Sequence, residues 1–160
     1  MKNLALILVL VYVSATAFGQ RVNFSGAWRL NQEKSELGPR FSLAPETLTV
    51  DHTRKILDLI SVTEFNGEEY QISQHFTLDG KACENKGFMD AVTHSTAGYD
   101  KKSGILTILT KGSVQGSSYT LTRTLSLQEG SLVITSDALS DMGRVNEIFV
   151  FDKFIPDQAN

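Results

Sequence analysis

The chain is poor in residues that cross-link or interrupt a fold, with one cysteine and three prolines among 160 residues. The single cysteine, Cys83, excludes an internal disulfide, so the folded domain must be stable through its core alone. Three histidines, His52, His75 and His94, match no short zinc-binding spacing, and we expect no metal site. The net charge of −3 is small and well mixed, which disfavours nucleic acid and anionic membranes as partners.

Sequence signatures of catalysis are also missing. The chain contains no Gly-x-Ser-x-Gly nucleophile turn, no glycine-rich phosphate loop and no cysteine–histidine pair suggested by context. The carboxylates are scattered over expected turns and outer faces rather than gathered at one place. We therefore predict a protein that is not an enzyme, with no catalytic residues and no cofactor.

Long apolar runs are confined to the beginning of the chain. The stretch "MKNLALILVLVYVSATAFG" has a basic head, an apolar run over residues 4–13 and small residues at its end, as secretory signals do. The run is too short for a stable membrane span, and no cysteine follows it that could carry a lipid anchor. We predict a signal peptide over residues 1–19, cleaved after Gly19 or after Ala17, and a periplasmic or secreted protein without a membrane anchor.

Most segments after residue 45 alternate between apolar and polar residues with a period of two, which is typical of half-buried β-strands. Short turn signals separate these segments and favour tight antiparallel hairpins. They are Asn66-Gly67, Asp79-Gly80, Lys102-Ser103-Gly104 and Glu129-Gly130. No long helix is indicated, and residues 32–40 are expected to form a surface turn and loop. The pattern predicts one all-β domain over residues 20–160, an antiparallel up-and-down meander of eight to ten strands.

A meander of this length has two exposed edges unless it closes into a barrel, whose interior is either filled or holds one small ligand. An open sandwich is the alternative architecture. The stretch "NFSGAWRLN" favours closure, because Gly26 lets the chain bend sharply and Trp28 can then lie across the barrel floor.

The Gly-x-Trp start resembles that of lipocalins. The longer block "SGAWRLNQEKS", followed in order by "LDGK", "GILTILTKG" and "FVFDK", resembles a bacterial secreted group of lipocalin-like, calycin-type β-barrels. The resemblance implies an up-and-down barrel that binds a small apolar molecule. It also implies that an arginine from late in the chain packs against Trp28, a role that Arg144 or Arg123 could fill. The Thr-Asp-Tyr element of typical lipocalins is absent.

Three polar residues, Gln74, Arg123 and Glu147, interrupt faces that are otherwise apolar and expected to point inward. A buried guanidinium needs a partner, because burying an isolated charge is very costly. In one interpretation Arg123 binds the carboxylate or phosphate of a ligand. In the other it is structural, either paired with Glu147 or stacked on Trp28.

We therefore expect an exported barrel that binds a small amphipathic or hydrophobic molecule in its interior without catalysis. The candidate ligand-binding residues are Arg123, Gln74, Tyr70, Phe76, Tyr119, Phe149 and Glu147, and the candidate barrel-closing residues are Gly26, Trp28 and Arg144. The main alternative is a solid-cored β domain that acts as an envelope structural or protein-interaction module. A hydrolase or isomerase with a general base at the barrel mouth is a third hypothesis. The sequence indicates no particular ligand or oligomeric state.

Overall fold

A computed structural model of the chain describes residues 21–39, 42–65, 67–87 and 90–156. The predicted signal peptide, residues 1–19, lies outside the described residues. Within the described ranges, no helix has the length and apolarity that crossing a lipid bilayer requires.

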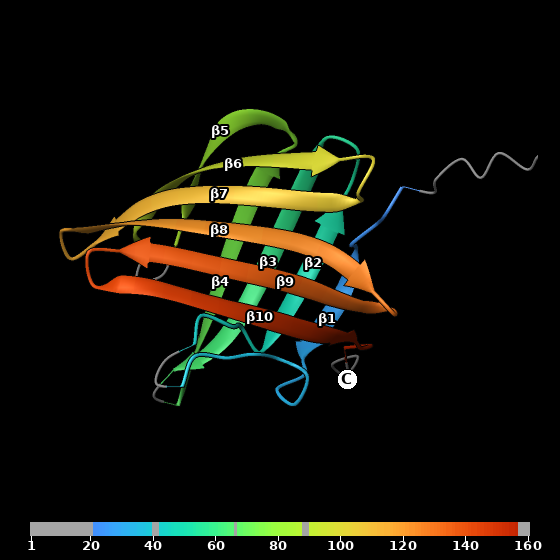
Figure 1. The fold of residues 1–160 in the computed structure, drawn as a ribbon, viewed down its shortest axis with the longest axis horizontal. Helices are drawn as coiled ribbons and strands as arrows, with labels where there is room; N and C mark the ends of the chain where they lie inside the picture. The colour runs from blue at the N-terminus through green and yellow to red at the C-terminus, as the bar shows by residue number, and fades with distance from the viewer. Residues whose placement is uncertain (1–20, 40–41, 66, 88–89, 157–160) are drawn as a thin grey trace, which may run out of the picture.

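Ten antiparallel strands follow one another along the chain, as Figure 1 shows. They are β1 (Gly26–Leu30), β2 (Thr47–His52), β3 (Ile56–Phe65), β4 (Glu68–Thr77), β5 (Asp79–Lys86), β6 (Val92–Asp100), β7 (Ile105–Val114), β8 (Ser117–Gln128), β9 (Ser131–Ser140) and β10 (Gly143–Lys153). They form one sheet in the order β4-β3-β2-β1-β10-β9-β8-β7-β6-β5. Apart from the pairing of β1 with β10, every neighbour in the sheet is also a neighbour in the chain. The predicted meander is confirmed.

The first and last strands lie side by side, which curls the sheet into a nearly closed barrel. Trp28 pairs with Lys153, and Leu30 pairs with Phe151. In Figure 1, strands β6 to β10 form a curved front layer that crosses strands β1 to β4 behind it. The predicted closure is confirmed, and the two edges of the sheet are β4 and β5, in the middle of the chain.

The connection between β4 and β5 differs from the predicted hairpin. The chain does turn at Asp79-Gly80, with Gly80 at a φ of 78°. However, no hydrogen-bonded ladder joins β4 to β5, and the pairing of β5 with β6 is irregular between Asp79 and Ala82. An irregularity of this kind bends a strand away from its neighbour. After the turn, β5 therefore pairs with β6, and a boundary without a backbone ladder, which we call the seam, remains between β4 and β5.

A side chain bridges this seam where the backbone does not. The Asn85 Oδ1 atom accepts a hydrogen bond of 2.7 Å from the His75 backbone N–H, and its Nδ2 atom donates one of 2.9 Å to the His75 carbonyl. The Asn85 side chain is buried, so water does not compete freely for these bonds. The two hydrogen bonds reproduce, through one amide, the exchange that a pair of facing residues makes in an antiparallel ladder.

We expect Asn85→Ala to lower the free energy of unfolding by about 2 kcal/mol, because it leaves both polar groups of the His75 backbone without their partner. Urea unfolding measures the loss. The exposed Asn146 of β10 provides the matched control, and Asn146→Ala should change stability by less than about 0.5 kcal/mol. Equal losses in the two variants would show that the seam is not held by Asn85.

The core lies between the two layers. Alternate residues of each strand point into it, as the period of two predicts. Its most completely buried large side chains are Phe24, Trp28, Phe76, Phe151, Leu57, Leu106, Ile108, Leu125 and Leu132. We call the end of the barrel that carries residues 21–25 and the turns at 53–55 and 101–104 the N-terminal end. The other end carries the turns at 115–116 and 141–142.

Candidate ligand-binding site in the barrel interior

The register of β7 to β10 arranges inward-facing residues in rows that run across the strands. One apolar row comprises Leu106, Leu125, Ile134 and Phe149. The next row, two residues further along each strand, comprises Ile108, Arg123, Ser136 and Glu147. The row after that begins with Ser95 on β6 and Thr110 on β7. Polar side chains therefore lie directly beside the apolar row, although the third row continues with the apolar Leu121 and Ala138.

Arg123 reaches across the interior from β8 to β4. Its Nη2 atom donates a hydrogen bond of 2.9 Å to the Gln74 Oε1 atom. Its Nε atom is buried and makes no hydrogen bond to any described residue. Burial lowers the pKa of Arg123 to about 10, so the guanidinium stays charged at neutral pH. Because the amide of Gln74 is neutral, this positive charge has no counter-charge among the residues that the structure describes.

Glu147 does not supply that counter-charge. It lies in the same row as Arg123, but Ser136 of β9 stands between them, so their backbones are about 10 Å apart. The Glu147 carboxylate instead accepts hydrogen bonds from the backbone N–H groups of Gly38 and Leu43, each 2.9 Å long. The predicted Arg123–Glu147 pair is therefore wrong, and Glu147 holds the long connection between β1 and β2 against the barrel.

Smaller polar groups extend the polar part of the interior. The hydroxyls of Ser95 and Thr110 share a hydrogen bond of 2.9 Å, and both side chains are buried. Tyr119 packs against Gly112 so closely that a Cβ atom there would lie 2.7 Å from its hydroxyl oxygen. Burial raises the pKa of Tyr119, so its phenol is neutral near neutral pH. Ser95 and Thr110 are not among the predicted site residues, although both alternate with outward residues in the same strands as Ala97 and Ile108.

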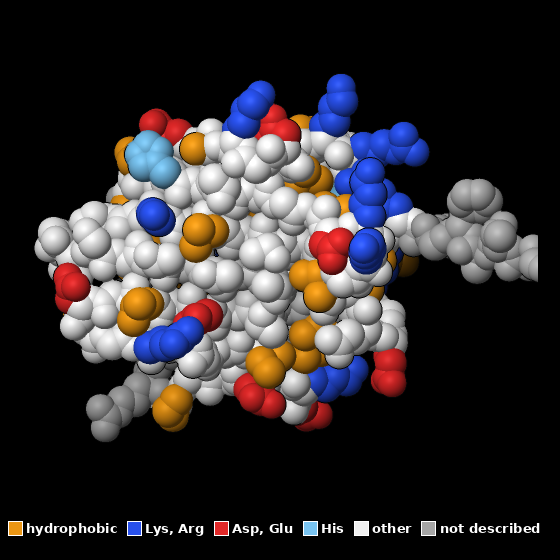
Figure 2. Space-filling model, turned by 45° about the horizontal axis from the view of Figure 1, so that its top comes forward, with side chains coloured by type: hydrophobic (Ala, Val, Ile, Leu, Met, Phe, Trp, Pro, Cys, Tyr) orange, Lys and Arg blue, Asp and Glu red, His pale blue; other side chains and the backbone are white. Residues whose placement is uncertain are grey.

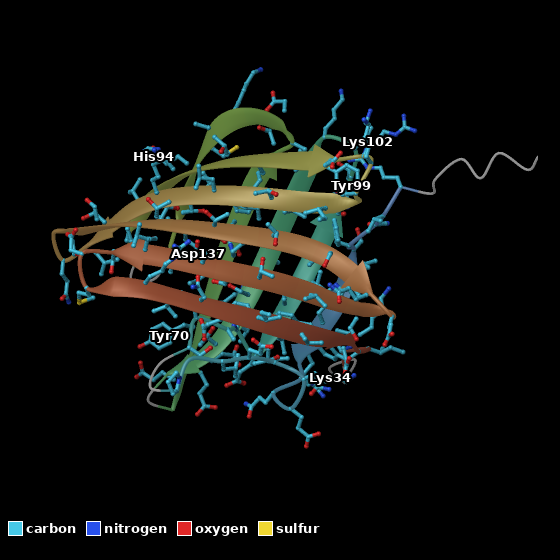
Figure 3. All side chains as sticks on the ribbon, in the orientation of Figure 1. Lys34, Tyr70, His94, Tyr99, Lys102 and Asp137 are labelled. Carbon is cyan, nitrogen blue, oxygen red and sulfur yellow. The ribbon has the colours of Figure 1, made fainter. Side chains whose placement is uncertain are left out.

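The remaining predicted ligand-binding residues have different surroundings. Phe76 and Phe149 are buried in the core beside the polar rows. Tyr70 lies at the far end of β4, where its hydroxyl donates a hydrogen bond of 2.9 Å to the Glu68 carboxylate. Figure 3 labels Tyr70 near the lower end of the barrel. The structure thus brings Arg123 and Gln74 together directly and leaves Tyr70 at the rim.

The cation that covers the Trp28 ring is Lys153, and not one of the predicted arginines. Its Nε1 atom donates a hydrogen bond of 2.9 Å to the Phe24 carbonyl, and the Lys153 ammonium lies 5.4 Å from its ring centroid. Gly26 makes room for Lys153, because a Cβ atom at Gly26 would lie 2.8 Å from the lysine Cε atom. The aliphatic stem and charge of Lys153 therefore cover the indole.

Arg144 plays no part in closing the barrel, in contrast to the prediction. It is exposed and forms an ion pair with Asp137 on the neighbouring strand β9, near the middle of the view in Figure 3. Because Trp28 pairs with Lys153, nine residues further along β10, Arg144 lies roughly 30 Å from it.

The three histidines lie on separate strands. The Nδ1 atom of His75 is 2.6 Å from an Asp58 carboxylate oxygen on the outer surface. Over the described ranges, no three or more histidine, cysteine, aspartate and glutamate side chains gather closely enough to hold a metal ion.

Ten antiparallel strands in a nearly closed barrel define a calycin-type, lipocalin-like fold. No protein-family model and no curated protein sequence matches this chain. Among solved structures, it is similar to the zebrafish ileal bile acid-binding protein complexed with cholic acid. The match has a TM-score of 0.55 and 14% sequence identity, and covers 82% of this chain and 98% of that one. At this identity the likeness shows the fold alone. It confirms the calycin-type barrel, and membership of a bacterial secreted group stays a prediction.

Proposed function

We propose that this protein binds a small amphipathic anion inside its barrel and does not act on it chemically. The observation that carries the proposal is the charged guanidinium of Arg123, which points into the interior, is half-buried and has a neutral amide as its partner. A cation that loses part of its hydration without gaining a counter-charge is costly. An anionic head group that accepted hydrogen bonds from Arg123, including its free Nε–H, would supply the missing charge.

The surroundings of Arg123 suit a ligand with an apolar body. The apolar row that includes Leu125, Ile134 and Phe149 is the neighbour of the row that contains Arg123, two residues away on each strand. A ligand whose head group binds Arg123 would therefore place its hydrocarbon part against that apolar row. The zebrafish protein of similar fold is complexed with cholic acid, which supports the same kind of use for this barrel. With the predicted leader removed, the protein would carry out this binding in the periplasm or outside the cell.

One observation favours the second function, a solid-cored module that acts through its surface. The Arg123–Gln74 hydrogen bond spans the interior, so a ligand has to displace Gln74 before it can reach the guanidinium. If this bond is permanent, the barrel interior is a polar cross-brace rather than a pocket, and the protein would serve as an envelope structural or interaction domain.

We expect Arg123→Gln to weaken the binding of a fluorescent fatty acid about tenfold, since hydrogen bonds to a charged partner contribute more than 1.4 kcal/mol. Binding of the uncharged alcohol with the same hydrocarbon chain should not change. Fluorescence titration measures both affinities. Arg144→Gln is the matched control, because it removes a guanidinium that is paired on the surface.

Two outcomes would contradict the proposed function. One is the absence of saturable uptake of either probe by the unmodified protein. The other is an equal loss of fatty acid and alcohol binding in Arg123→Gln, which would mean that the substitution damages the barrel rather than the head-group contact. Gln74→Ala provides a second test, because it removes the hydrogen-bond partner of Arg123 and keeps the guanidinium. Fatty acid binding in this variant should be at least as tight as in the unmodified protein.

A further inference from the structure

The N-terminal end of the barrel contains a second group of cationic side chains, separate from Arg123. The Arg21 Nη2 atom donates hydrogen bonds to the carbonyls of Thr53 and Arg54, at 3.3 and 3.4 Å. The Arg21 guanidinium also lies 4.7 Å above the ring of Tyr99, whose hydroxyl accepts a hydrogen bond of 3.1 Å from the Val22 N–H. Residues 21–22 therefore connect the β2–β3 turn with the β6–β7 hairpin.

A hollow of about 240 Å³ opens at this junction. Its lining consists of Arg21, Val22, Asn23, His52, Thr53 and Arg54. Two of these residues are cationic, and a third, His52, presents a buried imidazole. No acidic side chain belongs to the lining.

His52 contributes a hydrogen-bond donor that has no acceptor. Its side chain is 7% exposed, and its Nδ1 atom accepts a hydrogen bond of 3.4 Å from the Phe24 N–H. The neutral ring therefore carries its hydrogen on Nε2, which is buried without a partner among the described residues. The Nε atom of Arg21 is likewise buried and unpartnered. Burial and the nearby charge of Arg21 both lower the pKa of His52, so the ring is neutral at neutral pH.

Three more cations lie in the turns at this end of the barrel. Lys55 follows Arg54 in the β2–β3 turn, and Lys101 and Lys102 form the β6–β7 turn. All are exposed, and none is in an ion pair with a described residue. Figure 2 shows lysine and arginine side chains gathered over this end, and Figure 3 places Lys102 beside Tyr99 there.

The nearby acids Asp51 and Asp100 offset this group only in part, because five cations gather there. Asp51 alternates with His52 and points to the outer face of β2, opposite Asp58. The Asp100 carboxylate accepts hydrogen bonds from the Lys102 N–H and the Ser103 hydroxyl, so it is engaged within its own turn. An acidic protein, with a net charge of −3, thus concentrates positive charge at one end.

We propose that the hollow between Arg21, His52 and Arg54 binds a phosphate group, carried by a soluble phosphate ester or by a phospholipid head group. A phosphate dianion matches the charge of two guanidinium groups, which donate charge-assisted hydrogen bonds to phosphate oxygens. The His52 ring is part of the lining, so its resonances report on an anion bound there. A carboxylate carries only one charge and fits this cluster less well. The site is independent of the proposed interior ligand, because it uses neither Arg123 nor Gln74.

Titration of the folded, full-length protein with inorganic phosphate tests the proposal, with the His52 ring resonances followed by NMR. We expect a saturable shift of these resonances that sodium chloride at the same ionic strength does not produce. Arg54→Gln and Arg21→Gln should each weaken phosphate binding about tenfold, the loss expected for one charge-assisted contact. Arg144→Gln should leave it unchanged.

The proposal is overturned if phosphate and chloride shift His52 equally, or if Arg54→Gln binds phosphate as tightly as the unmodified protein. Arg54 is exposed, so this variant remains informative even if Arg21→Gln is unstable. The two sources of phosphate are distinguished with glycerol phosphate and with vesicles of phosphatidylcholine, pure or mixed with phosphatidic acid. Binding to either probe that Arg54→Gln weakens supports the site and identifies its source. Binding to neither overturns it.

Discussion

Replacing Trp28 with alanine should lower the free energy of unfolding by about 4 kcal/mol, the cost typical of removing a buried tryptophan. The side chain is 2% exposed and belongs to the same buried cluster as Phe24, Leu48 and Phe151. Its removal leaves a cavity between β1 and the strands that flank it, which these neighbours can fill only in part. Urea unfolding followed by circular dichroism measures the loss.

Trp28→Phe separates the packing of the ring from its hydrogen bond. Phenylalanine retains most of the apolar volume but cannot donate to the Phe24 carbonyl, so we expect a smaller loss of about 1–2 kcal/mol. If Trp28→Ala were no more damaging than Trp28→Phe, the indole would be dispensable and another residue would have to close this part of the barrel.

Glu147→Ala should be the second most damaging substitution, with a loss of about 3 kcal/mol. The carboxylate is 3% exposed and accepts two backbone hydrogen bonds, and bonds to a charged group contribute about 1.5–3 kcal/mol each. Without it, the N–H groups of Gly38 and Leu43 lose their acceptor. Hydrogen exchange should therefore accelerate at these two amides, whereas amides in β8 and β9 should be affected much less.

Two variants define what Glu147 contributes. Glu147→Gln keeps an acceptor oxygen and should recover part of the lost stability. Glu84→Ala removes an exposed carboxylate from β5 and should change stability by less than about 0.5 kcal/mol. If Glu147→Ala unfolds at the same urea concentration as Glu84→Ala, the connection between β1 and β2 is held by other contacts.

The strands and their inward faces could be predicted because both depend on local pattern. Gln74 and Arg123 both point inward, as their alternation with outward polar neighbours predicted. The meander order followed from short turns, which leave no room for other connections. The turn at Gln115-Gly116, where both residues have positive φ, was not singled out beforehand, although it has the same chemistry as the other hairpins.

The partners of individual side chains could not be predicted in the same way. Alternation shows which face a residue occupies but not what lies opposite, because that depends on register and curvature across the barrel. Arg123 and Glu147 share a face and a row, yet a strand separates them and each finds another partner. Lys153 rather than Arg144 covers Trp28, and only the pairing of β1 with β10 reveals which cation is close. The missing ladder between β4 and β5 could not be predicted either, because the only sequence signal there is the Asp79-Gly80 turn, which favours an ordinary hairpin.

The pairing of β1 with β10 also has a consequence for how the molecule assembles. Partners across this contact, such as Asn31 and Asp152, are 121 positions apart, so it forms against the greatest loss of chain entropy in the fold. During synthesis, β1 to β4 and β5 to β9 can each assemble early, but they remain two open ribbons until the final strand emerges. Until then, both ribbons offer unpaired backbone to neighbouring chains. The last strand, β10, therefore joins two open ribbons, which are prone to aggregate, into one nearly closed barrel.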